Sequence, residues 1–429
     1  MRHKLSIIFL SALLLVAGLP THSPARIYLD ISSAELRKIT VAVPYFINKT
    51  ENSKTEARGK GMSKTIEKAL AFHGFISIIN PELYGGGSDN NWKNLGAEFA
   101  VIGQYFVEPE GLMMELRLVD SSNGKMILGR RYRGDDTKEN LMLLRFCDEI
   151  ILKITGEQGV SLTQIAFVSD KSGHEEIYLA DVMGDEIKLI TRHRNLVVSP
   201  RFTPDGSHLL YTSYHQQNPN LYITDLSQSK VTRPLSRRKG LNIAPAVAPD
   251  GESMVITLSK DGNPDLYLLD MQGVIKQRLT NNEGINVSPS WSPDGKKLAF
   301  VSDRSGTPQI YIMNMKSLTV KRITYLGTYN TTPAWSPKGD WIAYSGRYEN
   351  MYHIYIIHPE GGSPTKLTQF WGDHESPSWS PDGRQIVFSR RRDNEQKIGI
   401  IFRNGSGFKI IFDQEGNESF PQWSPRKKL

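Results

Sequence analysis

A proline recurs through the second part of the chain at an almost constant interval. It stands at positions 200, 245, 289, 333, 377 and 421, so the successive spacings are 45, 44, 44, 44 and 44 residues. Each copy has the same order of features: a short strand with the proline, a turn such as Ser292-Pro293-Asp294-Gly295, an apolar strand and two further short strands. About four strands per repeat of this length are typical of a β-propeller blade. The repeat therefore predicts an all-β propeller over residues 161–429.

The two incomplete copies at the ends of the array decide the number of blades. The first copy begins at its second strand, and the last copy, 420–425 ("FPQWSP"), contains only a first strand. We predict that these two pieces share one blade and close a ring of six. Closure removes the sheet edges that would otherwise pair with other chains. The apolar second strands number six and stand at 165–167, 209–211, 254–256, 298–300, 342–344 and 386–388.

The repeated Ser-Pro-Asp-Gly turn has a structural explanation. Proline suits the second turn position because its φ is fixed, and Gly adopts a left-handed conformation at the fourth position. An aromatic ring buried between blades contributes on the order of 2–3 kcal/mol. We therefore interpret the motif as a frame element and not as a catalytic site. The residue two positions after each repeat proline is Phe202, Val247, Trp291, Trp335, Trp379 or Trp423.

Residues 39–156 have the pattern of a small α/β domain. The segment 39–46 ("ITVAVPYF") predicts a strand, and 60–74 and 137–155 predict amphipathic helices. The pair Asn123-Gly124 predicts a tight hairpin turn. The sequence contains no dinucleotide fingerprint and no P-loop, so no nucleotide cofactor is predicted.

The first 25 residues have the features of a secretory signal peptide. Arg2 and Lys4 precede an apolar run over 5–19, and Ser23-Pro24-Ala25 is an acceptable cleavage site. The alternative is an anchoring helix, but the apolar run is shorter than the ~20 residues needed to span a bilayer. We favour export with cleavage, and expect no membrane-spanning segment in the mature protein.

The net charge and the single cysteine bear on possible partners and on cysteine chemistry. The net charge is +7, and basic clusters at 237–239 and 390–392 are interpreted as solvated hairpin tips. An exported protein meets little nucleic acid, so none is predicted as a partner, whereas an acidic partner or lipid surface stays an alternative. The single cysteine, Cys147, shares a helical face with Leu143 and Ile150, which predicts a buried structural thiol.

The loops before the first strands are predicted to surround one mouth of the central channel. The residues there are mostly polar, so they could form a docking surface, a ligand site or an ordinary solvated rim. No H-E-x-x-H and no paired cysteines occur, and no metal site is predicted. Three residues before each proline lie Val197, Asn242, Asn286, Asn330, His374 and Glu418, and one residue before it lie Ser199, Ala244, Ser288, Thr332, Ser376 and Phe420.

The extended segment 26–38 begins with Arg26-Ile27-Tyr28-Leu29-Asp30, which alternates like a strand. From the residues alone it could pack into its own body, which we favour, or add as a strand to another protein.

Together, the signal peptide, the α/β domain and the "WSPDG" repeats resemble the TolB family, periplasmic components of the Tol–Pal system of Gram-negative bacteria. The resemblance covers residues 26–429. "WSPDG" also occurs in propellers of prolyl oligopeptidase-type peptidases, whereas "FPQWSP" near the C-terminus and "RIYLD" followed by "ITVAVPYF" are more specific.

The resemblance implies a non-enzymatic periplasmic adaptor without cofactors, which supports outer-membrane integrity and constriction during cell division. It implies that the segment 26–38 engages TolA through Arg26, Ile27, Tyr28, Leu29 and Asp30. Other outer-membrane proteins would be further partners. It also implies that one channel mouth docks the peptidoglycan-associated lipoprotein Pal, through candidates Asn242, Ala244, Asn286, Val287, Ser288, Asn330, Thr332, His374 and Glu418.

Two other functions, a peptidase and a small-molecule-binding propeller, are alternatives to the adaptor. A peptidase of the oligopeptidase type would carry a hydrolase domain, but the sequence contains no G-x-S-x-G and ends shortly after the last repeat. A propeller that acts on or binds a small molecule or sugar in its channel would depend on the pair His374 and Glu418.

Overall fold

The computed structural model describes residues 37–50, 56–87, 92–227, 232–412 and 414–426. The predicted signal peptide and the predicted TolA-binding residues Arg26, Ile27, Tyr28, Leu29 and Asp30 lie outside the described residues.

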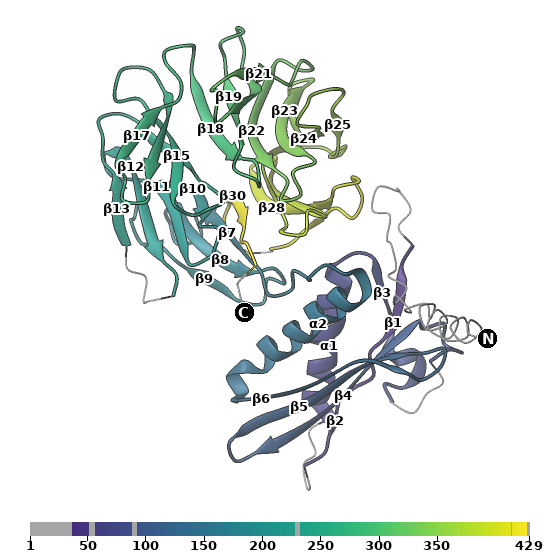
Figure 1. The fold of residues 1–429 in the computed structure, drawn as a ribbon. Helices are drawn as coiled ribbons and strands as arrows, with labels where there is room; N and C mark the ends of the chain where they lie inside the picture. The colour runs from purple at the N-terminus through teal and green to yellow at the C-terminus, as the bar shows by residue number, and fades with distance from the viewer. Residues whose placement is uncertain (1–36, 51–55, 88–91, 228–231, 413, 427–429) are drawn as a thin grey trace, which may run out of the picture.

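The N-terminal part is a mixed sheet with the strand order β3-β1-β4-β5-β6, and β2 pairs with β4. Strand β1 runs parallel to both β3 and β4, whereas β4, β5 and β6 form an antiparallel meander. Helices α1 and α2 pack together on the side of the sheet that faces the propeller (Figure 1). The elements are β1 (Ile39–Ala42), β2 (Ile47–Asn48), α1 (Glu56–Phe72), β3 (Ile76–Ile79), η1 (Pro81–Tyr84), β4 (Phe99–Glu108), β5 (Gly111–Asp120), β6 (Met126–Gly134), η2 (Asp136–Lys138) and α2 (Glu139–Thr155).

Helix α2 shows how the local sequence sets these elements. Gly156 ends the helix in a left-handed conformation with φ of 78°, and its N–H donates to the carbonyl of Leu152. The apolar face of α2 contributes Phe146 and Cys147 to the core of the domain. Cys147 is fully buried and burial raises its pKa well above the ordinary value, so the prediction of a structural thiol is confirmed.

The second part is a ring of six four-stranded antiparallel blades (Figure 1). The predicted fold class is confirmed, including the blade that the two ends of the array share. Five blades are continuous in sequence: β10–β13 (Val197–Phe202, His208–Gln216, Asn218–Asp225, Thr232–Ser236), β14–β17 (Asn242–Val247, Ser253–Leu258, Asp265–Asp270, Ile275–Arg278), β18–β21 (Asn286–Trp291, Lys297–Ser302, Gln309–Asn314, Val320–Arg322), β22–β25 (Tyr329–Trp335, Ile342–Tyr348, Met351–Ile357, Thr365–Lys366) and β26–β29 (Asp373–Trp379, Gln385–Arg392, Glu395–Phe402, Lys409–Ile410). The sixth has the order β30 (Glu418–Trp423), β7 (Gln164–Ser169), β8 (Glu176–Asp181) and β9 (Ile187–Leu189).

Strand β30 closes the ring by pairing with β7, so that Trp423 lies opposite Ile165. The indole Nε1 of Trp423 donates to Thr163 Oγ1 at 2.8 Å, and its backbone N–H donates to Ser378 Oγ of the neighbouring blade at 3.0 Å. Each first strand contacts the first strands of the adjacent blades around the ring. The six first strands therefore line the central channel.

The Ser-Pro-Asp-Gly turn has the geometry expected from its sequence. Ser292 Oγ donates to Asp294 Oδ1 at 2.7 Å, and the N–H of Gly295 donates to the carbonyl of Ser292 at 2.9 Å. Gly295 has φ of 68°, which explains why glycine ends the motif. These bonds stay within the turn that links β18 to β19, so the interpretation as a frame element is confirmed.

The α/β domain contacts the propeller beside two of these turns. Glu157, just after α2, pairs with Lys338 at 2.7 Å and with Arg384 at 3.3 Å. The Gln385 side-chain amide donates to the carbonyl of Phe72 at the end of α1, at 3.2 Å. Arg426, after β30, donates to the carbonyl of Gly159 at 3.0 Å. Contacts from two of the turns and from the C-terminal end of the propeller thus tie it to the α/β domain.

Candidate functional site: the central channel and its mouths

The channel has two differently built mouths. The loops that precede the first strands surround one end, which we call the loop mouth. The Ser-Pro turns that follow the first strands surround the other end, which we call the turn mouth. Because Lys338 and Arg384 lie beside two of these turns and pair with Glu157, the turn mouth faces the α/β domain. The loop mouth lies at the opposite end of the channel.

Every first strand has the same irregularity just before the repeat proline. The pairing register with the second strand shifts there in all six blades, as in a β-bulge. The residue at the bulge has a left-handed backbone, which is unusual for residues other than glycine and costs on the order of 1–3 kcal/mol. These residues and their φ angles are Ser199 (56°), Ala244 (51°), Ser288 (54°), Thr332 (49°), Ser376 (57°) and Phe420 (50°).

The bulge leaves two residues of each first strand half-buried, namely the left-handed residue and the one before it. In β18 these are Val287 and Ser288, and in β22 they are Thr331 and Thr332. The half-buried residues of the six bulges form one surface near the loop mouth, where Val287 also packs against the apolar core between its own blade and the next. Of the residues predicted to bind Pal, Ala244, Val287, Ser288 and Thr332 belong to this surface.

The other predicted Pal-binding residues are placed differently from the expectation of a rim. They lie three residues before the proline, each begins or nearly begins its first strand, and their side chains are buried within the wall. Sequence position alone did not show this burial. The relative exposures are 0% for Asn242, Asn286, His374 and Glu418, and 1% for Asn330.

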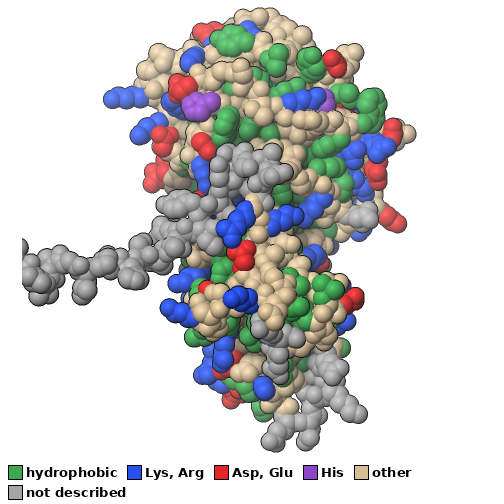
Figure 2. Space-filling view, turned by 90° about the vertical axis from the view of Figure 1, so that its right-hand side faces the viewer, with side chains coloured by type: hydrophobic (Ala, Val, Ile, Leu, Met, Phe, Trp, Pro, Cys, Tyr) green, Lys and Arg blue, Asp and Glu red, His purple; other side chains and the backbone are tan. Residues whose placement is uncertain are grey.

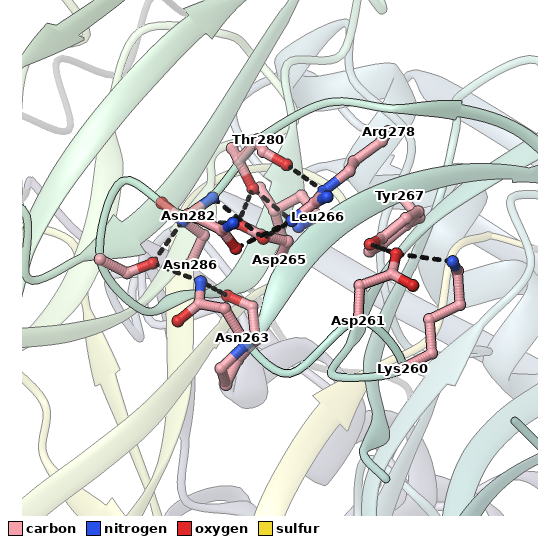
Figure 3. Close-up of polar contacts among 12 residues, drawn as sticks. Lys260, Asp261, Asn263, Asp265, Leu266, Tyr267, Arg278, Thr280, Asn282 and Asn286 are labelled. Carbon is pink, nitrogen blue, oxygen red and sulfur yellow. Dashed lines mark hydrogen bonds and ion pairs between the residues drawn. The ribbon is translucent and has the colours of Figure 1, made fainter. Parts of the chain in front are cut away.

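The surroundings of Asn286 show what such a buried residue does (Figure 3). Its Nδ2 donates to Asp265 Oδ1 at 3.0 Å, and Asp265 stands at the start of the third strand of the preceding blade. Thr280 Oγ1 donates to the same Oδ1 at 2.7 Å and accepts from the N–H of Leu266 at 2.9 Å. Asp265, Thr280 and Asn286 therefore connect two neighbouring blades through one buried carboxylate.

The carboxylate of Asp265 stays ionised in this setting. Burial by itself would raise its pKa, but the hydrogen bonds from Arg278 and Thr280 outweigh burial and hold the pKa below the ordinary value. The nearest oxygen of Asp265 lies 2.5 Å from Arg278 Nη2. A buried charge is therefore paired and hydrogen-bonded, as its solvation cost requires.

The same connection recurs with other side chains in the next blade. Thr324 Oγ1 donates to Gln309 Oε1 at 2.8 Å, and Asn330 Nδ2 donates to the same oxygen at 2.8 Å. A threonine nine residues before the repeat proline, present in four copies, was a sequence signal for this connection. These threonines are Thr191, Thr280, Thr324 and Thr368.

His374 and Glu418 do not form an accessible pair on the channel surface, because both are fully buried. His374 stacks on His353 with ring centroids 5.7 Å apart, and Phe370 and Phe388 contact it edge-on. Burial, and then the neighbouring His353, lowers the pKa of His374 to about 3, so the ring is neutral at pH 7. Glu418 Oε2 accepts from the N–H of Ile398 at 3.3 Å. Among the described residues, no group of three or more His, Cys, Asp or Glu could hold a metal ion.

Exposed apolar side chains gather at the loop mouth. Six of the seven large apolar side chains exposed in the described part of the propeller belong to loops or strand ends on this side. Tyr325 is 72% exposed and Trp371 is 64% exposed. Elsewhere, Figure 2 shows a face on which hydrophobic and charged side chains of both signs are mixed. The six residues are Ile285, Tyr325, Leu326, Tyr329, Tyr348 and Trp371.

At the turn mouth, the first strands and turns enclose a cavity of about 340 Å³. Its walls consist mainly of prolines, six from the turns and three from the first strands, and of the aromatic rings that stand two residues after the repeat prolines. The rings are Phe202, Trp291, Trp335, Trp379 and Trp423. The aromatic residue of each repeat thus has a surface on the cavity as well as contacts between blades.

A closed six-bladed ring, with a channel walled by six equivalent strands and an α/β domain at one mouth, defines a two-domain β-propeller protein. The particular family follows from comparison with known proteins. The family model described as the TolB beta propeller domain matches residues 151–427, and the chain belongs to this family.

Individual relatives agree with this assignment. The chain is 46% identical over 211 residues to a protein named Tol-Pal system protein TolB from Desulfotalea psychrophila, and 37% identical over 216 residues to one of the same name from Desulfosudis oleivorans. The first match covers 49% of this chain and 48% of the relative, and the second covers 48% and 49%. The matched region therefore spans about half of the length of these relatives.

A solved structure resembles almost the whole chain. The crystal structure of TolB from Acinetobacter baumannii aligns with a TM-score of 0.80 at 27% identity, and covers 91% of this chain and 97% of that one. Both the α/β domain and the propeller therefore have counterparts there. Within the described residues, no helix is long and apolar enough to cross a membrane.

Proposed function

We propose that this protein is a non-enzymatic periplasmic adaptor of a Tol–Pal system, which docks the lipoprotein Pal at the loop mouth. The names of the relatives support the assignment to this system. The observation that carries the docking surface is the gathering of exposed aromatic and aliphatic side chains at the loop mouth, including Tyr325, Tyr329 and Trp371. Tyrosine and tryptophan are enriched in the parts of interfaces that contribute most binding energy.

The two sets of candidate residues have different tasks in this proposal. Ala244, Val287, Ser288 and Thr332 are half-buried at the bulges and would contact a segment of Pal that enters the loop mouth. The buried candidates would act from behind this surface, because they fix the ends of the first strands on which it lies. These are Asn242, Asn286, Asn330, His374 and Glu418.

The N-terminal segment completes the adaptor. Export through the signal peptide at 1–25 places the protein in the periplasm, where Arg26, Ile27, Tyr28, Leu29 and Asp30 engage TolA. Other outer-membrane proteins are further possible partners of the same surfaces. The function that follows is maintenance of the outer membrane and its constriction at division.

Two substitutions at the loop mouth test the docking of Pal. Ile285→Arg places a charge at an exposed position of the loop mouth, and Trp371→Ala removes an exposed anchor, while both leave the buried connections intact. We expect each variant to weaken capture of purified Pal at least tenfold without changing thermal unfolding. Val274→Ala, an exposed apolar residue outside the loop mouth, is the matched control. Unchanged Pal binding in both variants contradicts the assignment of the mouth.

The TolA interaction is tested separately. Deletion of residues 26–31 is expected to weaken a TolA pull-down and to leave Pal binding intact or stronger. TolA binding that is unaffected by the deletion rules out this segment as the contact.

A further inference from the structure

At one channel-lining position of the repeat, a single blade has a charged residue that the fold does not require. The residue directly after each repeat proline lines the channel near the turn mouth. Five of the six are small or neutral, and one is an arginine. They are Arg201, Ala246, Ser290, Ala334, Ser378 and Gln422. Because the other blades form without a charge at this position, Arg201 is not needed to build the strand.

Arg201 has no charged partner in the described part of the chain. Its Nη1 donates to the carbonyl of its own neighbour Pro200 at 2.8 Å, and no described carboxylate is among the groups that shift its pKa. A guanidinium carries five N–H donors. Burial lowers the pKa of Arg201 to about 10, so the group keeps its positive charge at neutral pH.

The cavity of about 340 Å³ at the turn mouth includes Arg201 in its wall. Among the described residues that line it there is no aspartate or glutamate, and Arg201 is the one charged residue. Arg201 is half-buried, and a partly desolvated cation without a counter-ion is costly, so an anionic ligand lowers that cost. The volume falls in the range of about 300–1,000 Å³ in which small-molecule sites are found.

The remaining wall indicates which anion fits. Tryptophan and proline faces from several blades surround the cavity, including Trp291 and Trp335, and suit a flat apolar body. Ser290 Oγ, in the same wall, accepts from the N–H of Trp335 at 3.0 Å and can still donate its own proton. A guanidinium binds a carboxylate through two parallel N–H···O bonds.

We propose that the turn-mouth cavity binds a small organic carboxylate. Arg201 holds its carboxylate group, and the ring of tryptophan and proline side chains holds an apolar or aromatic body. This site lies at the other end of the channel from the proposed Pal surface and does not depend on that proposal.

The test is a calorimetric titration of the mature full-length protein with benzoate and with indole-3-acetate. Benzamide, which has the same ring without the charge, and acetate, which has the charge without the ring, are expected to bind at least about tenfold more weakly. Inorganic phosphate is titrated in the same way. No binding of either aromatic acid at millimolar concentration, or equal binding of benzamide or of phosphate, overturns the proposal.

Variants assign the binding to Arg201. Arg201→Gln introduces the residue that Gln422 already supplies at the equivalent position, so the fold tolerates it, and it is expected to weaken benzoate binding at least about tenfold. Arg233→Gln, at an exposed arginine outside the cavity, is the matched control and is expected to bind as the parent does. Equal benzoate affinity in Arg201→Gln and the parent overturns the role of Arg201.

A carboxylate could belong to a free acid or to the end of a peptide chain. A tetrapeptide that ends in phenylalanine, and the same peptide with an amidated C-terminus, separate the two sources. Tighter binding of the peptide acid than of benzoate, with loss in the amide, assigns the site to a chain end, and the reverse order assigns it to a free acid. Equal binding of the peptide acid and its amide contradicts carboxylate recognition.

Discussion

Thr280 Oγ1 donates a hydrogen bond of 2.7 Å to Asp265 Oδ1, and the same oxygen accepts from Asn286 of the next blade at 3.0 Å. One carboxylate oxygen thus joins the start of a third strand, the second residue after a fourth strand and the start of the following first strand. Asp265 and Asn286 are both fully buried. The polar residues that precede the repeat prolines therefore hold neighbouring blades together.

Removal of the Thr280 hydroxyl is expected to destabilise the propeller. Thr280→Val keeps the volume but leaves Asp265 without one donor and the N–H of Leu266 without its acceptor. The expected cost in free energy of unfolding is about 1–3 kcal/mol, measured by urea denaturation. Thr319→Val, at an exposed threonine, is the control and is expected to change stability by less than about 0.5 kcal/mol. Equal effects of the two variants would show that the connection contributes nothing.

His374 is expected to make stability depend on pH. Its pKa is about 3 in the folded state and 6.5 ordinarily, so the unfolded chain binds a proton more readily. The stabilising effect of the neutral ring is therefore present above pH 6.5 and is lost as the pH falls towards 3. His374→Asn introduces the residue found in three other blades, at Asn242, Asn286 and Asn330.

The measurement is the difference in Tm between His374→Asn and the parent from pH 7.5 to pH 4. Carboxylates titrate in both proteins and cancel in the difference. The difference is expected to shift in favour of the variant as the pH falls. A difference that stays constant over this range contradicts the prediction.

Closure of the ring is expected to depend on Trp423. This residue is 2% exposed, contacts Phe72 of the α/β domain and donates from its indole to Thr163. Trp423→Ala is expected to lower the free energy of unfolding by about 3–5 kcal/mol, measured by chemical denaturation. Trp371→Ala, at an exposed tryptophan, serves as the comparison, and a similar loss there would rule out the special role of the closing strand.

The junction between the two domains is expected to depend on Glu157. Arg384 is 6% exposed, lies over the ring of Phe75 at 5.0 Å and pairs with Glu157. Glu157→Ala leaves this buried cation without its counter-charge. Because Glu157 itself is partly exposed, the expected cost is about 1–3 kcal/mol.

Limited proteolysis between α2 and β7 measures this effect, and the Glu157→Ala variant is expected to be cleaved faster than the parent. Glu349→Ala, at an exposed glutamate in a hairpin, is the control. Cleavage rates equal to that of the parent would show that the pair does not hold the domains together.

Two features of the fold could be predicted from the sequence alone, namely the number of blades and the way the ring closes. The spacing of the prolines predicted six blades, and the two partial copies predicted which strands would close the ring. Both predictions follow from local sequence rules. Each repeat encodes its own strands and turns, and the ring closes because one partial copy supplies the strand that the other lacks. The buried Cys147 was predictable for the same reason, because helical periodicity places it on an apolar face.

The sequence by itself determined the blade, the number of copies and the turn at which a first strand reverses into a second. Only the tertiary structure decided which side chains near the proline reach the channel. A left-handed bulge in each first strand leaves both Val287 and Ser288 half-buried while Asn286 is fully buried, and alternation along an ideal strand does not predict this outcome. Likewise, the described residues around Arg201 offer it no counter-ion, and this became evident only when six distant segments formed one cavity, because it is a property of the closed ring and not of any single repeat.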